Sequence, residues 1–327
     1  RTVLGAGGGL DFALPVGGVP GSFDVQVTRD RDDPGRLRTG DLGEDDEQVL
    51  EDAGDDPDKA VAGGVTAVEP GTGSYDQDLD GTKTIYVYNP DGGDYDVAFY
   101  YVGAEKGDYA LESLTGTGDR IFLHVGDDTG NYRIGRPLPL PESKSVMTTW
   151  LSLGDTTGVY LRGEWNAGDH DKNVLSGIDN DDNQGQAAHV AGGILGRDVG
   201  LGTLDLSGFL QDKDANFSPF QVHKTVFDYD PWGLADRARR EGFLEEADRE
   251  AGAQAGWSLG TGSKRISLKG NLGRLRHGAS VEADQASAAG DWSFYGGRGT
   301  HVHQSANARD EVDPLDTRRD LKNHQVS

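Results

Sequence analysis

Hydrophobic and polar residues alternate along the second half of the chain. Apolar or small residues occupy every second position in three stretches: Val159, Leu161, Gly163 and Trp165; Leu204, Leu206, Gly208 and Leu210; and Ile266, Leu268, Gly270 and Leu272. The intervening positions are mostly polar, as at Arg162 and Glu164. A period of two predicts strands with one apolar and one polar face. We expect such strands near residues 146–153, 157–166, 187–195, 202–211, 253–260, 264–275, 286–295 and 299–306.

The connections between these strands alternate in length. Short turns are expected at residues 154–158, 196–202, 260–264 and 296–299, and longer Asp-rich loops at 167–186, 212–252 and, more briefly, 276–285. Short turns on one side and long loops on the other are typical of membrane β-barrels. The pattern predicts an all-β fold with antiparallel strands over residues 142–309, as a whole or partial up-and-down β-barrel. A soluble β-sandwich remains the alternative.

The first 141 residues form a predicted β-rich domain with a repeated motif, V-x4-G-[S/D/N]-Y. Copies occur at Val68–Tyr75, Val102–Tyr109 and Val125–Tyr132, and a partial copy ends at Tyr95. Glycine before a small polar residue suits a tight turn with positive φ. We therefore predict a β-meander in which each tyrosine begins or packs the next strand.

Six further segments complete the predicted domain organisation. Strand-like runs lie at Leu4–Leu14 and Ser22–Thr28, and a short helix is expected around Asp45–Ala53. The run Pro137–Pro141 reads as an extended linker between the two domains. A helical pattern at residues 233–251 predicts a short surface helix, and residues 310–327 form a predicted polar tail.

Charge and composition narrow the candidate partners. The formal net charge is -25, with 56 acidic against 31 basic residues, most of the acidic ones Asp, and there is no cysteine. Nucleic acid and anionic membrane surfaces are poor partners for such a surface. The acidity suits either a high-salt environment or cation-binding loops. No apolar run is long enough for a membrane helix, and the chain, which begins at Arg1, is interpreted as part of a longer one.

One candidate calcium site follows the first repeat. Asp76, Asp78 and Asp80 alternate before Gly81, like the first half of an EF-hand loop. The twelfth position is Val87 rather than Glu, so a full EF-hand is not expected. The pattern favours either a simpler Ca²⁺-binding turn or a hairpin turn with solvated charges.

A second candidate calcium site lies in the predicted loop 167–186. Two D-x-D-x-N units lie ten residues apart, and their ligands are Asp169, Asp171 and Asn173, then Asp179, Asp181 and Asn183. Hard oxygen ligands at this spacing suit Ca²⁺. The alternative is an Asx-rich loop that satisfies its own backbone.

Catalytic patterns are weak. His301 and His303 share one strand face, which is a poor metal signal by itself. Glu164 and Asp205 lie on predicted strands and could face a barrel interior together, but structural polarity is the stronger interpretation. A glycoside-processing enzyme would need facing carboxylates in a cleft lined by tryptophans such as Trp165, Trp232 or Trp257. We expect the protein not to be an enzyme.

These motifs together resemble a group of proteins. The V-G-x-x-x-G-D-Y repeats, the PLPLP run and the paired D-x-D-x-N units, over residues 61–295, are similar to large uncharacterised β-rich surface proteins of Bacteroidota-like bacteria. Some of these distantly resemble the giant barrel of the gliding, or type 9, translocon. The resemblance implies an outer-membrane or cell-surface location and transfers no catalytic residue.

The expected function is structural. We expect a cell-envelope or outer-membrane protein that acts as a scaffold, pore or adhesion surface, with Asp-rich loops ordered by Ca²⁺, and with outer-membrane or cell-surface components, or further subunits, as partners. The alternative is a secreted, soluble β-sandwich that binds glycans or assembles with partner subunits in a filament. The outward face of the alternating strands distinguishes them: a continuous apolar belt about 25 Å tall favours the barrel.

Overall fold

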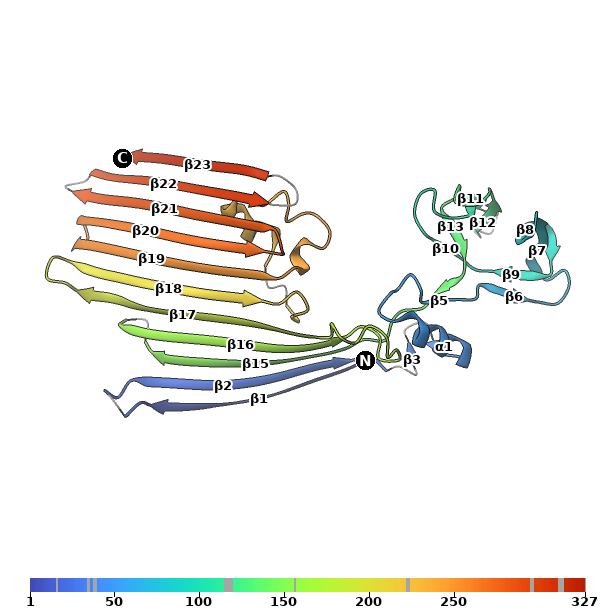
Figure 1. Ribbon diagram of the computed structural model, residues 1–327, viewed down its shortest axis with the longest axis horizontal. Helices are drawn as coiled ribbons and strands as arrows, with labels where there is room; N and C mark the ends of the chain where they lie inside the picture. The colour runs from blue at the N-terminus through green and yellow to red at the C-terminus, as the bar shows by residue number, and fades with distance from the viewer. Residues whose placement is uncertain are drawn as a thin grey trace. The chain divides into compact units, whose positions relative to one another are not determined.

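The chain folds into two compact units (Figure 1). This computed structural model describes residues 1–326 except 16, 34–35, 38–39, 115–119, 156, 222–223, 295–296 and 311–314. The first unit contains residues 1–31, 143–171 and 181–327, and the second contains residues 32–142 and 172–180. The protein is all-β in class, and its one described α-helix is α1 (Glu44–Ala53), where the sequence predicts a helix.

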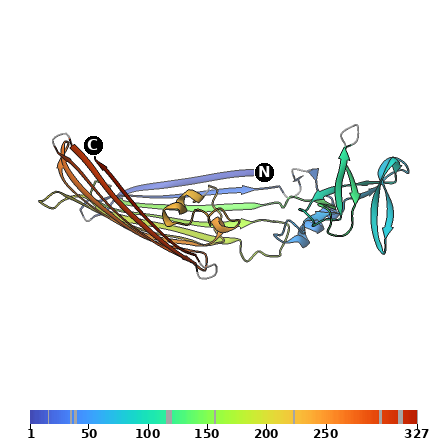
Figure 2. The ribbon, with the colours of Figure 1, turned by 90° about the horizontal axis from the view of Figure 1, so that it is seen from above.

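The first unit is one antiparallel sheet of 11 strands, which we call the large sheet (Figure 1). Its strands pair in chain order, from β1 at one edge to β23 at the other, so the sheet is open and not closed into a barrel. Figure 2 shows the strand direction turning across the sheet, as the twist of β-strands requires. The strands are β1 (Thr2–Ala13), β2 (Pro20–Arg31), β15 (Ser143–Gly154), β16 (Val159–Asp171), β17 (Gln184–Asp198), β18 (Thr203–Lys213), β19 (Asp248–Thr261), β20 (Lys264–His277), β21 (Val281–Phe294), β22 (Gly297–Asp310) and β23 (Leu315–Val326).

All eight strands predicted from alternation are present as β15 to β22, and most are longer than expected. The length of the connections also alternates. Connections of at most four residues link β15 to β16, β17 to β18, β19 to β20 and β21 to β22 at one end of the sheet, where the β1–β2 turn also lies. We call this the short-turn end. The opposite, long-loop end carries the connections 32–142, 172–183 and 214–247, whereas the predicted loop at 276–285 shrinks to residues 278–280.

The boundaries of the units differ from the predicted domains. Strand β2 pairs with β15, so residues 1–31 belong to the large sheet although more than 100 residues separate the two strands. Residues 315–326 form β23 and pair with β22 instead of ending the chain as a polar tail. Both differences arise because strand pairing is non-local: the partner of an edge strand is not encoded in the strand's own sequence.

The second unit contains a tandem duplication. Its first copy has strands β6 (Val65–Ala67), β7 (Gly73–Asp80), β8 (Lys83–Gly93) and β9 (Tyr95–Val97), in the spatial order β6-β9-β7-β8. Its second copy has β10 (Phe99–Tyr101), β11 (Tyr109–Leu114), β12 (Arg120–His124) and β13 (Tyr132–Ile134), in the equivalent order β10-β13-β11-β12. Each structural copy therefore contains the sequence motif twice.

The two copies exchange equivalent hydrogen bonds. The Tyr75 hydroxyl accepts the Phe122 backbone N–H at 3.1 Å, and the Tyr109 hydroxyl accepts the Tyr86 N–H at 3.0 Å. Both tyrosines are buried and surround Phe99, whose ring stacks on that of Phe122 with centroids 4.5 Å apart. The copies therefore form one shared aromatic core, which confirms that the motif tyrosines pack.

The motif glycines serve a different purpose from the one predicted. Gly73 lies opposite Gly93, and Gly107 opposite Gly130, in extended backbone rather than at positive φ. A Cβ atom on Gly93 would lie 2.3 Å from the Tyr75 carbonyl oxygen. The prediction of a tight turn at these glycines is wrong: glycine is needed because two backbones approach closely there.

The remainder of the second unit packs around α1. Leu50, Ala53 and Ala60 form a buried cluster with Leu138 of the PLPLP run. The run is therefore packed structure and not a free linker: Leu138 donates its N–H to the Ala60 carbonyl. Two short antiparallel pairs complete the unit, namely β5 (Val61–Ala62) with β14 (Arg136–Pro137) and β3 (Arg36–Leu37) with β4 (Gly40–Asp41).

Candidate functional site

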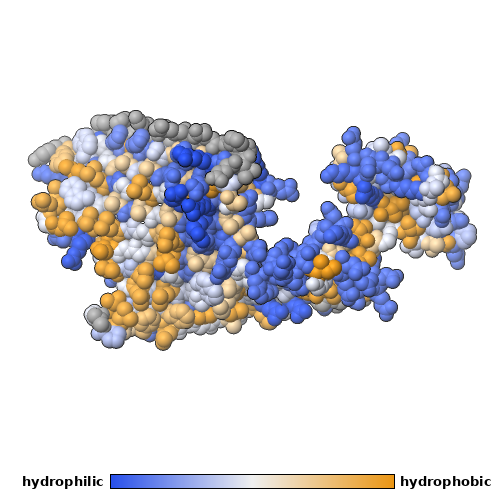
Figure 3. Space-filling view, viewed as in Figure 1, coloured by the Kyte–Doolittle hydropathy of each residue, from blue (hydrophilic) through white to orange (hydrophobic). Residues whose placement is uncertain are grey.

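One face of the large sheet is an exposed apolar surface, which we call the belt. The strand register brings the predicted apolar positions of successive strands together: Leu161 pairs with Gly192, Leu206 with Ala255 and Leu268 with Trp257. Figure 3 shows apolar residues gathered over the strands of this unit. The belt consists of Leu10, Phe23, Val25, Val27, Leu151, Leu153, Val159, Leu161, Trp165, Val190, Ile194, Leu206, Leu210, Trp257, Leu259, Ile266, Leu268, Leu272 and Trp292, with Ala and Gly between them.

The belt is large and unusually exposed. Leu210, Leu268 and Leu272 have 64%, 54% and 66% of their surface accessible. Along β19 the belt runs from Ala251 to Leu259, which is a strand length of about 27 Å at about 3.4 Å per residue. The belt extends from β1 to β21 and ends at β22, where His301 and His303 occupy the equivalent register positions. An apolar face of this size marks an interaction surface, because single exposed apolar residues are common but continuous fields are not.

The opposite face of the large sheet, which we call the polar face, carries mostly polar and small residues, with the aromatic residues Trp150, Tyr160 and Phe209 among them. Its central positions include Glu164, His189, Gln254, Asn271 and Gln285, with glycine and alanine between them. At the long-loop end this face is covered by residues 214–247, which we call the covering segment. Tyr229, Trp232, Leu234 and Phe243 of that segment form a buried cluster with sheet residues such as Leu275, Ala283 and Ala308.

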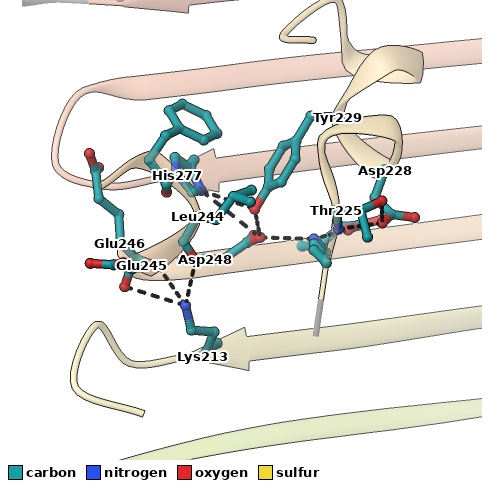
Figure 4. A network of polar contacts seen from close by, with 12 residues as sticks. Lys213, Thr225, Asp228, Tyr229, Leu244, Glu245, Glu246, Asp248 and His277 are labelled. Atoms are coloured by element: carbon teal, nitrogen blue, oxygen red, sulfur yellow. Dashed lines mark hydrogen bonds and ion pairs between the residues drawn. The ribbon is translucent and has the colours of Figure 1, made fainter. Parts of the chain in front are cut away.

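A buried polar network holds the covering segment (Figure 4). Asp248 lies at its centre and is 3% exposed. Its Oδ2 atom accepts the Tyr229 hydroxyl at 2.8 Å and the Lys224 ammonium at 2.9 Å, and the same lysine donates to Glu250 at 2.6 Å. Burial, with the adjacent Asp248 carboxylate, raises the pKa of Tyr229. The phenol therefore stays protonated and continues to donate to the carboxylate.

Two further sheet residues bind the backbone of the covering segment. The Lys213 ammonium donates to the carbonyls of Leu244 and Glu246 at 3.1 and 3.0 Å, with a longer contact to Glu245. The His277 ring is fully buried, and its Nε2 lies 2.7 Å from the Phe243 carbonyl. The Phe243 carbonyl also accepts the Glu246 N–H within the second 3-10 turn, so the two side chains tie the carbonyls of this turn to the sheet.

The predicted helix at residues 233–251 is absent. The covering segment instead contains two 3-10 turns, η1 (Val226–Trp232) and η2 (Phe243–Glu245), and β19 begins at Asp248. The physical reason is tertiary: Leu234 and Phe243 are buried against the polar face, and an amphipathic helix would have to release the carbonyls that Lys213 and His277 bind. Sequence reasoning also missed Asp248, His277 and Lys213, which lie at the ends of β19, β20 and β18 but outside the shorter predicted strands.

The first candidate calcium motif lies on a strand rather than in a loop. Asp76, Asp78 and Asp80 are on β7, before a two-residue hairpin turn at Gly81 and Thr82. The Asp76 carboxylate accepts hydrogen bonds from the Asn89 amide at 2.7 Å and the Asp94 N–H at 3.2 Å, which fix the repeat. In the described part of the chain, no three His, Cys, Asp or Glu side chains are grouped so as to hold a metal ion.

The second candidate motif is divided between the units. Asp169, Asp171, Asp181 and Asn183 belong to the large-sheet unit, whereas Asn173 and Asp179 belong to the second unit. Asn173 is fully buried, and its amide donates to the Leu50 and Gly54 carbonyls at the end of α1, both at 2.7 Å. Ser176 likewise donates to the Glu51 carbonyl, so residues 172–180 cap this helix. Calcium binding by either motif stays a prediction.

The structure brings together neither the two carboxylates nor the three tryptophans considered for catalysis. Glu164 and Asp205 both lie on the polar face, but Gln211 is level with Glu164 and Asp205 is six residues further along β18, about 20 Å away. Asp205 instead accepts the Gly196 N–H at 2.6 Å. Trp165 and Trp257 are on the belt, whereas Trp232 belongs to the covering segment and is buried against the polar face, so the three tryptophans line no common cleft.

Comparisons with protein-family models, with curated proteins and with solved structures give no match. Among the described residues, no helix is long and apolar enough to cross a membrane. The candidate functional surface is therefore defined by the geometry of the large sheet alone.

Proposed function

We propose that the large sheet is a membrane-embedded β-wall of the cell envelope, with the belt against lipid and the polar face toward an aqueous interior. The observation that carries the proposal is the continuous, exposed belt between β1 and β21, backed by a polar face. Its length of about 27 Å along a strand corresponds to a height of about 20 Å at the roughly 40° strand tilt of membrane barrels, which is close to their apolar band of roughly 25 Å. The protein would act as a scaffold or pore wall, without catalysis.

The connections support an orientation. Membrane barrels have short turns on the inner side and long loops on the outer side. The second unit is inserted in the connection between β2 and β15, at the long-loop end, so in this proposal it is a cell-surface module. The covering segment would narrow the aqueous interior from the same side, because it is fixed against the polar face.

The proposal requires partners for the edge strands β1 and β23. Backbone groups cannot remain unpaired in lipid, so β1 and β23 need partners in the membrane-inserted state. Ten successive antiparallel pairings make β1 and β23 run in the same direction. Direct pairing of the two edges would be parallel, and antiparallel closure needs an odd number of further strands, from this or another polypeptide.

A cysteine scan tests the proposal, because the chain has no native cysteine to interfere. Leu268→Cys and Leu272→Cys place a label on the belt, and the matched controls Lys269→Cys and Asn271→Cys place it on the other face of the same strand. With an environment-sensitive fluorophore in phosphatidylcholine vesicles, we expect blue-shifted emission and quenching by lipid-borne nitroxides only at the two belt positions.

The opposite result would identify the soluble alternative. If belt and control labels are equally insensitive to lipid-borne quenchers, and the chain fractionates without detergent, the belt is not lipid-facing. A protein partner or a second sheet would then cover it, as in a sandwich assembled between subunits.

A further inference from the structure

A row of charged residues borders the belt at the long-loop end. The register places Asp212, Arg249, Arg276, Glu282 and Arg309 side by side across β18 to β22. A second row, nearer the belt, contains Arg274 and Asp284. All of these residues are on the belt's face. The apolar positions begin at Leu210 and Ala251 on β18 and β19, and one row further on, at Leu272 and Ala286, on β20 and β21.

The arginines are crowded. Arg249 and Arg276 are directly opposite each other on β19 and β20, where Cα atoms are about 4.5–5.5 Å apart. Like charges at such positions are unfavourable unless anions lie among them. Asp212 pairs with Arg249 at one side and Glu282 pairs with Arg276 at 2.9 Å at the other, so the protein's own carboxylates flank the two guanidinium groups.

The arginines of the border are accessible. Four arginines and three carboxylates lie in these rows, and Arg309 is also level with Asp316 on β23, so the charges balance along the border while two guanidinium groups are adjacent at Arg249 and Arg276. The Arg249, Arg274 and Arg276 side chains remain 64%, 53% and 56% exposed despite their ion pairs. Arginine forks match the oxygens of a phosphate group, and two neighbouring forks match them better than one.

We infer that the charged border binds the phosphate headgroup of a membrane lipid, with the acyl chains lying on the adjacent belt. The inference rests on the proposed function, because it assigns a lipid to the outer boundary of the proposed membrane wall. The adjacent guanidinium groups of Arg249 and Arg276 select a phosphate headgroup, and the apolar residues nearby select an amphiphile over a soluble phosphate. The carboxylates on either side restrict the site to one headgroup between Arg249 and Arg276.

The test is lipid binding to the full chain in non-ionic detergent micelles, measured by native mass spectrometry. We expect phosphatidylglycerol to remain bound in preference to phosphatidylcholine. The variant Arg249→Gln with Arg276→Gln should weaken phosphatidylglycerol binding about tenfold, because charged hydrogen bonds are lost, and leave phosphatidylcholine unchanged. Arg265→Gln, at the other end of β20 and on the polar face, is the control and should bind like the wild type.

Three outcomes would overturn the inference. They are equal retention of the two lipids, an unaltered double variant with wild-type strand content by circular dichroism, and displacement of phosphatidylglycerol by millimolar inorganic phosphate, which would indicate a free-anion site. The fluorescence scan keeps the two proposals separate, since it uses phosphatidylcholine only. If the belt labels lie in lipid but the protein shows no headgroup preference, only this inference is wrong. If the belt labels lie in water, both the proposed function and this inference are wrong.

Discussion

The large sheet and the duplicated copies at residues 65–135 use alternating strands in opposite ways. In the duplicated copies, large side chains point into a shared core: Tyr75 and Tyr109 are 4% and 3% exposed. In the large sheet, Leu210 and Leu272 are 64% and 66% exposed. Alternation by itself therefore says that a strand has two different faces, and the presence of a second layer decides whether the apolar face is buried within the chain.

The largest expected difference between the two regions concerns charge on the belt. Leu206→Arg together with Leu268→Arg, near the middle of the belt, should lower the free energy of unfolding from a bilayer by about 4–8 kcal/mol, because each arginine at the middle of a lipid face costs about 2–4 kcal/mol and the sites are separated by a strand. Urea unfolding from phosphatidylcholine vesicles, followed by tryptophan fluorescence, measures the loss.

Substitutions on the other face are the controls for the belt. Asn271→Arg and Gln254→Arg, made singly, lie on the polar face and should each change the unfolding free energy by less than about 1 kcal/mol. The duplicated copies should be unaffected in all of these variants. A belt variant as stable in the bilayer as its control would remove the contrast between the regions.

The second expected effect belongs to the duplicated copies. Gly93→Ala would place a Cβ atom 2.3 Å from the Tyr75 carbonyl oxygen and 2.4 Å from its carbon, and a backbone cannot yield as a side chain does. We expect a loss of about 3 kcal/mol from this overpacking. Amide hydrogen exchange in β7 to β9 reports it, while exchange in the large sheet stays unchanged.

Gly63→Ala is the matched control for Gly93→Ala. A Cβ atom at Gly63 meets nothing within 4 Å, and the residue has no positive φ. It should be neutral to within about 0.5 kcal/mol. Equal effects at Gly63 and Gly93 would show that the paired motif glycines are not required by close backbone approach.

Local patterns predicted the local features of this fold. The period of two located β15 to β22, and the acidic stretch before Leu50 located α1. Those patterns act over a few residues, so a single segment carries them. The sequence predicted an apolar face on each strand of the belt, and the register between the strands brings these faces together.

Features that depend on distant partners were not predicted. The pairing of β2 with β15 spans the inserted unit, and Asp248 meets Tyr229 only because the covering segment folds back on the sheet. The D-x-D-x-N spacing pointed to calcium, yet Asn173 caps α1, which is more than 100 residues away in sequence. Closely spaced Asp and Asn residues can bind a metal ion or form hydrogen bonds with the backbone, and only the fold shows which of the two they do.

The smallest expected effect tests the symmetry of the duplicated copies. Tyr75→Phe and Tyr109→Phe each leave one buried backbone N–H, of Phe122 and Tyr86 respectively, without its hydroxyl acceptor. We expect each variant to lose about 1–2 kcal/mol by this mechanism. Because the two hydrogen bonds are equivalent in the two copies, the losses should agree within about 0.5 kcal/mol. Tyr101→Phe is the control, since Tyr101 is 62% exposed. Thermal unfolding of the full chain, with exchange in β8 and β12 as the local readout, measures all three. A large loss in one copy and none in the other would mean that the copies share a topology but not an energetic role, and that a single copy supports the aromatic core.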